Sequence, residues 1–240
     1  MKYTILIAFL FFINSTTAQV FIDKGLIEYQ VVSNNHKAMG EGIWAEMMRD
    51  KIPKLSTSFF QLTFNTDKSI FLFNLKDEKT KSPWRNEAED NVWYNDYKSE
   101  NFVQQKSVFG DIYILTDSLV KINWKMTNET REIAGFNCRK AVGVIFDSVY
   151  VFAFYTDEII VSGGPMGLHG LPGMILGITI PRMFSSWVAT KVEVNGVNYN
   201  ILNAPTKGKK KKAKELQETA VKVTKEWGNW GQQAVWGIFL

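Results

Sequence analysis

The sequence predicts a mainly β protein, a single domain with an antiparallel curved sheet or partial barrel and one or two packed helices. Many short segments alternate apolar and polar residues or are rich in strand formers. Several links between them carry turn residues typical of hairpins, such as Thr66-Asp67-Lys68 and Asn195-Gly196. In two other stretches the apolar residues recur at helical spacing. Because 45% of the residues are hydrophobic, the chain has enough apolar material for a sizeable core.

Residues 1–18 have the three parts of a secretory signal peptide: Lys2, an apolar run at 3–13, and small residues ending at Ala18. The apolar run is shorter than the roughly 20 residues that a membrane span needs. The one cysteine of the chain is Cys138, so no lipoprotein anchor is expected at the cleavage site. We therefore predict an exported chain.

The first half of the mature chain predicts strands at 26–33, 58–65 and 69–75, where strand formers dominate or apolar residues alternate. Residues 40–54 predict a short amphipathic helix, because four large apolar residues recur at helical spacing and a proline ends the run. The polar segment Lys76 to Asn101 fits no period, and we interpret it as a surface excursion.

Further strands are predicted at 102–109, 112–117, 120–126, 128–135, 138–146 and 149–156. Both faces of the last pair are apolar, whereas a strand of a sheet exposed on one side alternates with polar residues. This hairpin is therefore buried on two sides, or one of its faces lines a cavity.

A segment rich in glycine and proline follows, from Gly163 to Arg182. Glycine permits positive φ and close backbone approach, while proline fixes φ. The apolar run from Met174 to Ile180 predicts a buried strand directly after it. We expect a stiff loop that is clamped to the core where it ends.

The hexapeptide 170–175, GLPGMI, resembles the signature of the GLPGLI family and differs from it at one position. Trp124, the Cys-x-Lys-Ala element at 138–141 and the Tyr-Thr pair at 155–156 extend the resemblance over about 112–187. The resemblance implies an exported, mostly β protein of Bacteroidetes-type bacteria. Since such cells have two membranes, it places the chain in the periplasm or outside the cell. It brings no established activity.

The C-terminal part predicts a strand at 185–194, a tight turn, and a strand at 197–202. The composition then changes to lysines, followed by an amphipathic helix over about 213–227. We predict a signal peptide (1–18), a β-rich domain (19–204), and a basic linker, amphipathic helix and Trp-rich tail (205–240).

The glycine-rich loop is the candidate binding loop, because defined loops on rigid scaffolds often carry function. The alternative is a tight turn beside the core. Its candidate residues are Gly164, Pro165, His169, Gly170, Leu171, Pro172 and Gly173. Met166, His169 and Met174 lie close in sequence and would suit copper, although methionine is ordinarily a packing residue.

No catalytic residue is assigned. A serine hydrolase needs a nucleophile, a histidine and a carboxylate, but the mature chain has His36 and His169 and no Gly-x-Ser-x-Gly element. A Cys138–His169 pair is conceivable, but Cys138 begins an apolar strand, which predicts a buried, unreactive thiol. The absence of HExxH, paired cysteines and a phosphate-binding loop gives no reason to expect a cofactor.

The lysine run comprises Lys207, Lys209, Lys210, Lys211, Lys212 and Lys214. The six positive charges of this run exceed the net charge of +4, so the rest of the chain is mildly acidic. The run predicts either a solvated loop or weak docking to an anionic membrane or glycan, with a tail tryptophan at the interface. Nucleic acid is not an expected partner of an exported chain.

These features favour a non-catalytic envelope protein, a binding or accessory module for an apolar or extended partner. That partner would be an apolar ligand, a peptide or another envelope protein. The alternatives are a hydrolase acting outside the cytoplasm, and an assembly partner of an outer-membrane complex.

Overall fold

The computed structural model describes residues 21–80, 87–146, 148–227 and 229–239. The predicted signal peptide lies outside these ranges. The strands are β1 Gly25–Asn34, β2 Leu55–Phe64, β3 Lys68–Lys76, β4 Val92–Asp96, β5 Asn101–Val108, β6 Asp111–Ser118, β7 Lys125–Ile133, β8 Phe136–Ile145, β9 Val149–Thr156, β10 Met174–Ile180, β11 Ser185–Glu193 and β12 Lys209–Lys211. The helices are α1 Asn35–Ala38, α2 Ile43–Arg49, α3 Ala213–Thr224 and α4 Asn229–Phe239.

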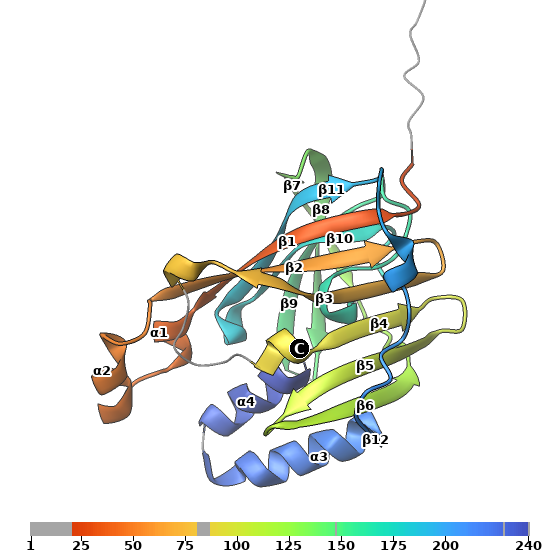
Figure 1. The fold of residues 1–240 in the computed structure, drawn as a ribbon. Coiled ribbons are helices and arrows are strands. Elements are labelled where there is room, and N and C mark those ends of the chain that lie inside the picture. Colours follow the sequence, from red (N-terminus) through yellow and green to blue (C-terminus); the bar gives the residue numbers. More distant parts are fainter. Residues whose placement is uncertain (1–20, 81–86, 147, 228, 240) are drawn as a thin grey trace, which may run out of the picture.

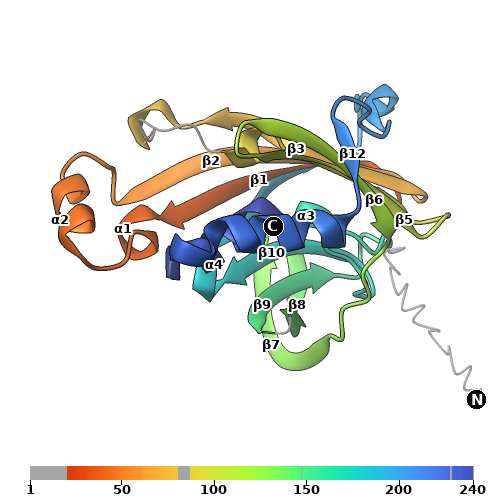
Figure 2. The ribbon, with the colours of Figure 1, turned by 90° about the horizontal axis from the view of Figure 1, so that it is seen from below.

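All twelve strands form one open, curved sheet in the order β12-β6-β5-β4-β3-β2-β1-β11-β10-β9-β8-β7 (Figure 1). Neighbours are antiparallel except β12, which runs parallel to β6. Figure 2 shows the curvature from below, with α3 and α4 beside the sheet. The predicted mainly β, curved-sheet fold is therefore confirmed.

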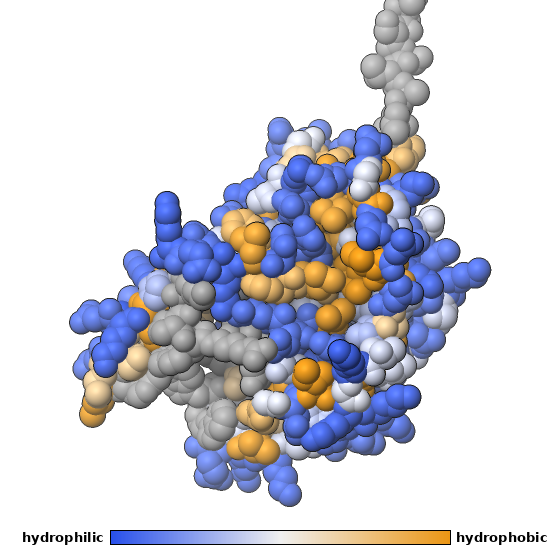
Figure 3. Space-filling model, in the orientation of Figure 1, coloured by the Kyte–Doolittle hydropathy of each residue, from blue (hydrophilic) through white to orange (hydrophobic). Residues whose placement is uncertain are grey.

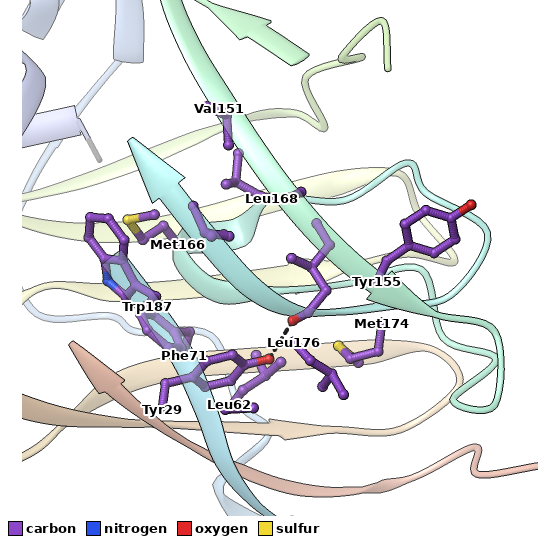
Figure 4. Close-up of a cluster of buried hydrophobic side chains, with 14 of the residues drawn as sticks. Tyr29, Leu62, Phe71, Val151, Tyr155, Met166, Leu168, Met174, Leu176 and Trp187 are labelled. Carbon is purple, nitrogen blue, oxygen red and sulfur yellow. Dashed lines mark hydrogen bonds between the residues drawn. The ribbon is translucent and has the colours of Figure 1, made fainter. Parts of the chain in front are cut away.

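The core lies on the concave face of the sheet. Alternate residues of β1 to β3 point into it, and three of them, Ile27, Leu62 and Phe71, are at most 1% exposed. Tyr29 on β1 reaches across this core and donates a hydrogen bond of 2.6 Å to the carbonyl of Ile175 on β10 (Figure 4). This contact ties two non-adjacent strands of the curved sheet together.

A second apolar cluster joins the C-terminal helices to β5 and β6. It contains Phe102, Val108, Leu115, Leu216, Ala220, Val235 and Ile238. The predicted amphipathic helix is confirmed, as α3 continued by a 3-10 turn at Lys225–Trp227. The second helix, α4, was not predicted. Within the described residues, no helix has both the length and the apolar character that a membrane crossing requires.

Three local predictions were wrong. Residues 120–124 form no strand, and β7 begins at Lys125 and continues through a bulge to Ile133. Residues 76–101 contain β4, an inner strand, where only a surface excursion was expected. The segment 197–202 forms a 3-10 turn at Tyr199–Ile201 instead of a strand.

That turn belongs to a segment that crosses the outer face of β3 to β5 on its way from β11 to β12 (Figure 1). Leu202 in this segment is buried with Ile70 and Tyr94. Apolar side chains gather over the middle of this face among hydrophilic ones (Figure 3). The segment therefore covers apolar outer positions that the sheet would otherwise expose.

Candidate functional site

Residues 119–124, here called the strap, link the two ends of the sheet. β6 lies next to one end of the strand order and β7 lies at the other, so the chain between them must cross the open side. The amide of Leu119 donates to the carbonyl of Glu100 at 2.8 Å. The rest of the strap belongs to no helix or strand and pairs with no strand of the described sheet.

The candidate loop holds the strap in place through Trp124. The indole Nε1 of Trp124 donates a hydrogen bond of 2.9 Å to the carbonyl of His169. The ring lies so close to Gly143 that a Cβ there would be 2.8 Å from Trp124 Cζ3. A Cβ on Gly170 would be 3.4 Å from the indole nitrogen. Glycine at 143 makes room for the tryptophan, whereas at Gly170 the positive φ of +94° is what favours glycine.

His169 is half-buried between the strap and the loop. Burial lowers the pKa of its imidazole, and a hydrogen bond with the backbone of Val120 opposes this only in part. The Nε2 atom is buried and has no partner among the described residues, so Nδ1 makes the bond to Val120. The imidazole therefore favours its neutral form, and its buried Nε2 makes no hydrogen bond within the described residues.

The loop backbone is fixed on both sides. Asn95 on β4 donates through Nδ2 to the carbonyl of Gly167 at 3.0 Å. The amide of Gly170 donates to Ser162 Oγ at 2.9 Å. At the loop exit the amide of Ile175 donates to the carbonyl of Gly163 at 2.8 Å. The expected clamping of the loop to the core is therefore present.

The individual loop residues divide into core and surface positions. Gly164, Pro165, Leu171 and Gly173 are buried, whereas Gly170 and Pro172 are exposed. Gly164 is extended, but a Cβ there would lie 2.7 Å from the Cβ of Ile175. The path of the backbone, more than an exposed binding face, accounts for these glycines. Of the candidate loop residues, His169 is the one whose side chain adjoins both hollows described next.

The larger hollow is a cavity of about 670 Å³ between the strap, β5 and the C-terminal helices. Its apolar lining includes Phe102, Ile122, Val144, Phe146, Leu168 and Phe239, and its polar lining includes Asn95, Gln104, Lys121 and His169. A second hollow of about 520 Å³ lies across the strap and shares His169. Val144, Ile145 and Phe146, at the end of β8 and in the turn after it, line this cavity, whereas no residue of β9 does. Val144 and Tyr150 on the outer face of the hairpin are 43% and 56% exposed, so neither predicted alternative describes the whole hairpin.

The copper hypothesis finds no support in the geometry. Met166 lies beside Trp187 on one side of the core cluster, and Met174 lies near Tyr155 on the other (Figure 4). Both methionines are buried as packing residues. Among the described residues, no group of three His, Cys, Asp or Glu side chains is placed to hold a metal.

Cys138 is fully buried, and its thiol lies 3.5 Å from the carbonyl of Phe136. Burial, with a smaller contribution from Glu158, raises the pKa of the thiol to about 12. A neutral thiol is a poor nucleophile, so the geometry supports the predicted packing role.

Five of the six lysines of the run are exposed, as a solvated loop requires, but part of the run is a strand. Lys209 to Lys211 form β12 at the edge of the sheet. Lys209 pairs with Asp111 at 2.8 Å, and Lys211 donates to Thr219 Oγ1 at 3.1 Å. Lysines on an edge strand discourage pairing with a second sheet. Lys207, Lys210, Lys212 and Lys214 are exposed, and their contact with an anionic surface stays a prediction.

Sequence reasoning missed a group of buried polar side chains where β4 and β5 face the core. Asn91, Trp93, Asn95 and Lys106 are each at most 2% exposed. The signal that could have revealed them is the two-residue spacing of 91, 93 and 95, which puts all three on one face of a strand.

Comparison with protein families gives a match over residues 54–219 to the model described as "N-glycanase peptide, N-terminal domain". The chain belongs to this family. The match corrects the GLPGLI resemblance, which rested on a hexapeptide and a few scattered residues. A short Gly/Pro motif reports the backbone path that a turn requires, so it does not identify a family.

Two solved structures of PNGF-II, in space groups P21 and C2, resemble this chain with TM-scores of 0.51 and 0.50. Each is 19% identical and covers 86% of this chain, a likeness that shows the fold alone. The chain spans about a third of their length, 34% and 33% respectively. No curated protein matches it.

Proposed function

We propose that this chain is a non-catalytic binding module whose ligand is an extended, apolar peptide segment held in the larger cavity. The observation that carries the proposal is the cavity itself, about 670 Å³ with a mainly apolar lining and a few polar groups. That combination is typical of ligand sites in proteins.

The strap adds support for an extended ligand. It runs along the cavity, and Val120, Lys121 and Ile122 all line it. Apart from Val120, whose backbone bonds to His169, these residues pair with no strand of the described sheet. An extended peptide gains affinity from main-chain hydrogen bonds and specificity from side-chain pockets.

The family supports an accessory role in glycan processing, because its model describes the N-terminal domain of an N-glycanase. We therefore propose that the peptide segment belongs to a glycan-bearing protein. We also propose that the chain is exported to the periplasm or beyond, which rests on the predicted signal peptide.

The alternative hydrolase gains no support from the cavity. Hydrolysis by paired carboxylates requires two acidic side chains beside the scissile bond. Among the described residues that line the larger cavity, none is Asp or Glu. The third possibility, an assembly partner, remains a proposal without a specific observation in its favour.

Blocking the cavity tests the proposal. Val120 lines the cavity and is 64% exposed, so Val120→Trp should fill the entrance without disturbing the core. Val194, which is 43% exposed and lines none of the hollows described above, provides the control Val194→Trp. The probes are fluorescent ten-residue peptides with alternating Leu and Ser, with and without an Asn-linked glycan, measured by fluorescence polarisation.

Wild type and Val194→Trp should bind the peptides equally, and Val120→Trp should raise the Kd at least tenfold. Equal binding by all three proteins would place the ligand elsewhere. Cleavage of either probe by the wild type would contradict a non-catalytic role.

A further inference from the structure

The inner faces of β4 and β5 carry a polar row, here defined as Asn91, Trp93 and Lys106. The register pairs Val92 with Gln105 and Trp93 with Gln104, so Lys106 lies opposite Asn91 on the face that carries Trp93. Lys106 is 0% exposed, and its Nζ lies 4.0 Å from the centre of the Trp93 ring. The three side chains therefore form one buried group.

Each member of the polar row has a hydrogen-bond donor without a partner in the part of the chain that the structure describes. These donors are Asn91 Nδ2, Trp93 Nε1 and Lys106 Nζ. Asn91 is held in place by its other atom, since Oδ1 accepts a bond of 2.9 Å from the amide of Ser107. Buried donors without acceptors destabilise a fold, and three together indicate that something else supplies the acceptors.

The charge of Lys106 restricts what that acceptor is. No described carboxylate pairs with its amine, and burial alone lowers its pKa well below the ordinary value. A buried ammonium group without a counter-charge is unfavourable, whereas one that faces an anion is stabilised. A carboxylate fits, because it brings a negative charge together with two oxygens that accept several hydrogen bonds.

The larger cavity lies directly beside the polar row. Gln104 lines the cavity, is the cross-strand partner of Trp93, and precedes Lys106 by two residues on the same strand. Residues two apart on a strand are separated by roughly 7 Å. Asn95, two residues after Trp93 on β4, also lines the cavity and has an unpartnered Oδ1. Asn95 and Gln104 therefore lie at the border between the cavity and the row, on the same face of β4 and β5.

We propose that the polar row binds a carboxylate of the ligand whose apolar part occupies the cavity. This inference rests on the proposed function and specifies its ligand, as a peptide with an acidic group beside its apolar residues. The carboxylate has two sources in a peptide, the C-terminus and a Glu or Asp side chain, and both present the same chemistry.

The test uses three versions of one fluorescent Leu/Ser decapeptide: a free C-terminus, an amidated C-terminus, and an amidated C-terminus with one internal Glu. Binding is measured to wild type, Lys106→Met and Lys125→Met. Lys106→Met retains much of the side-chain volume and removes the amine. Lys125 is exposed and lines neither of the two hollows, so Lys125→Met controls for the loss of one positive charge elsewhere on the protein.

At least one acidic peptide should bind wild type at least tenfold more tightly than the amidated peptide, and which one does so identifies the source of the carboxylate. Lys106→Met should abolish this preference, and Lys125→Met should retain it. Lys106→Gln, which keeps donors without charge, replaces Lys106→Met if the latter does not fold. Equal binding of acidic and amidated peptides by wild type, or a preference that survives at Lys106→Met, would overturn the carboxylate site while leaving the proposed function intact.

If no peptide binds, the proposed function fails and n-octanoate tests the polar row independently. Saturable quenching of tryptophan fluorescence by octanoate in wild type, with its loss in the Lys106 variant, would support the site. Absence of any response, or the same response in both proteins, would overturn it.

Discussion

Replacing Gly173 with alanine tests the idea that backbone geometry dictates the glycines of the loop. Gly173 has φ +133°, a conformation that residues with a side chain rarely adopt. A Cβ at this position would also collide with the carbonyl oxygen of Thr156, the residue of β9 that pairs with Met174. Backbone strain of this kind costs about 1–3 kcal/mol, and overpacking costs about 1–3 kcal/mol more. We expect Gly173→Ala to lower the free energy of unfolding by about 3 kcal/mol.

Gly196→Ala is the matched control. Gly196 also has positive φ, +71°, but nothing lies within 4 Å of the added Cβ. Gly196→Ala should lower the free energy of unfolding only by the cost of a left-handed backbone conformation, about 1–2 kcal/mol. Urea unfolding followed by tryptophan fluorescence measures both variants. Equal losses of stability at Gly173 and Gly196 would refute the argument that the loop is locked against β9.

Three further predictions concern titratable groups. Burial lowers the pKa of Lys106 in the folded state, whereas in the unfolded chain this side chain stays protonated up to about pH 10.4. Between these two pKa values the unfolded chain binds more protons than the folded one, so raising the pH stabilises the fold. The free energy of unfolding of the wild type minus that of Lys106→Met, measured by urea unfolding, should therefore increase from pH 7 to 10, by at most about 1.4 kcal/mol per pH unit. A difference that does not change with pH would contradict this. Cys138, with a pKa of about 12, should react slowly with a thiol reagent in native buffer and rapidly in urea, and fast native labelling would show that the thiol is accessible. The exposed lysines of the run should bind anionic vesicles in a flotation assay at low salt, and much less at physiological salt. A double variant, Lys210→Gln with Lys212→Gln, should lose this binding. Absence of binding by the wild type at low salt would limit the run to its role at the sheet edge.

The alternation of apolar residues predicted most of the sheet, because a strand with one buried face shows a period of two regardless of its distant partners. β4 escaped prediction for a physical reason. Two of its inward positions and the position before it are polar or amphipathic, namely Asn95, Trp93 and Asn91, so the apolar contrast between faces is lost. Two of these residues, Asn91 and Trp93, also belong to the polar row.

The candidate site was predictable only in part. The density of glycine and proline predicted a stiff loop, and His169 was recognised as its distinctive side chain. The hydrogen bond from Trp124 to the carbonyl of His169 joins residues 45 positions apart, and no local pattern encodes such a pairing. The cavity likewise depends on where the strap crosses, which follows from the strand order and not from any one segment.

The central position of β1 has a consequence for how the chain is made. One partner of β1, β2, follows at Leu55–Phe64, whereas the other, β11, is complete only at Glu193. A growing chain therefore carries one unpaired edge of β1, with Ile27, Tyr29 and Val31 beside it, during most of its synthesis. Open apolar edges invite pairing with other chains, and contacts this distant in sequence form slowly. A truncation that ends before Ser185 would remove the second neighbour of a central strand, although in sequence it trims only the last quarter of the chain.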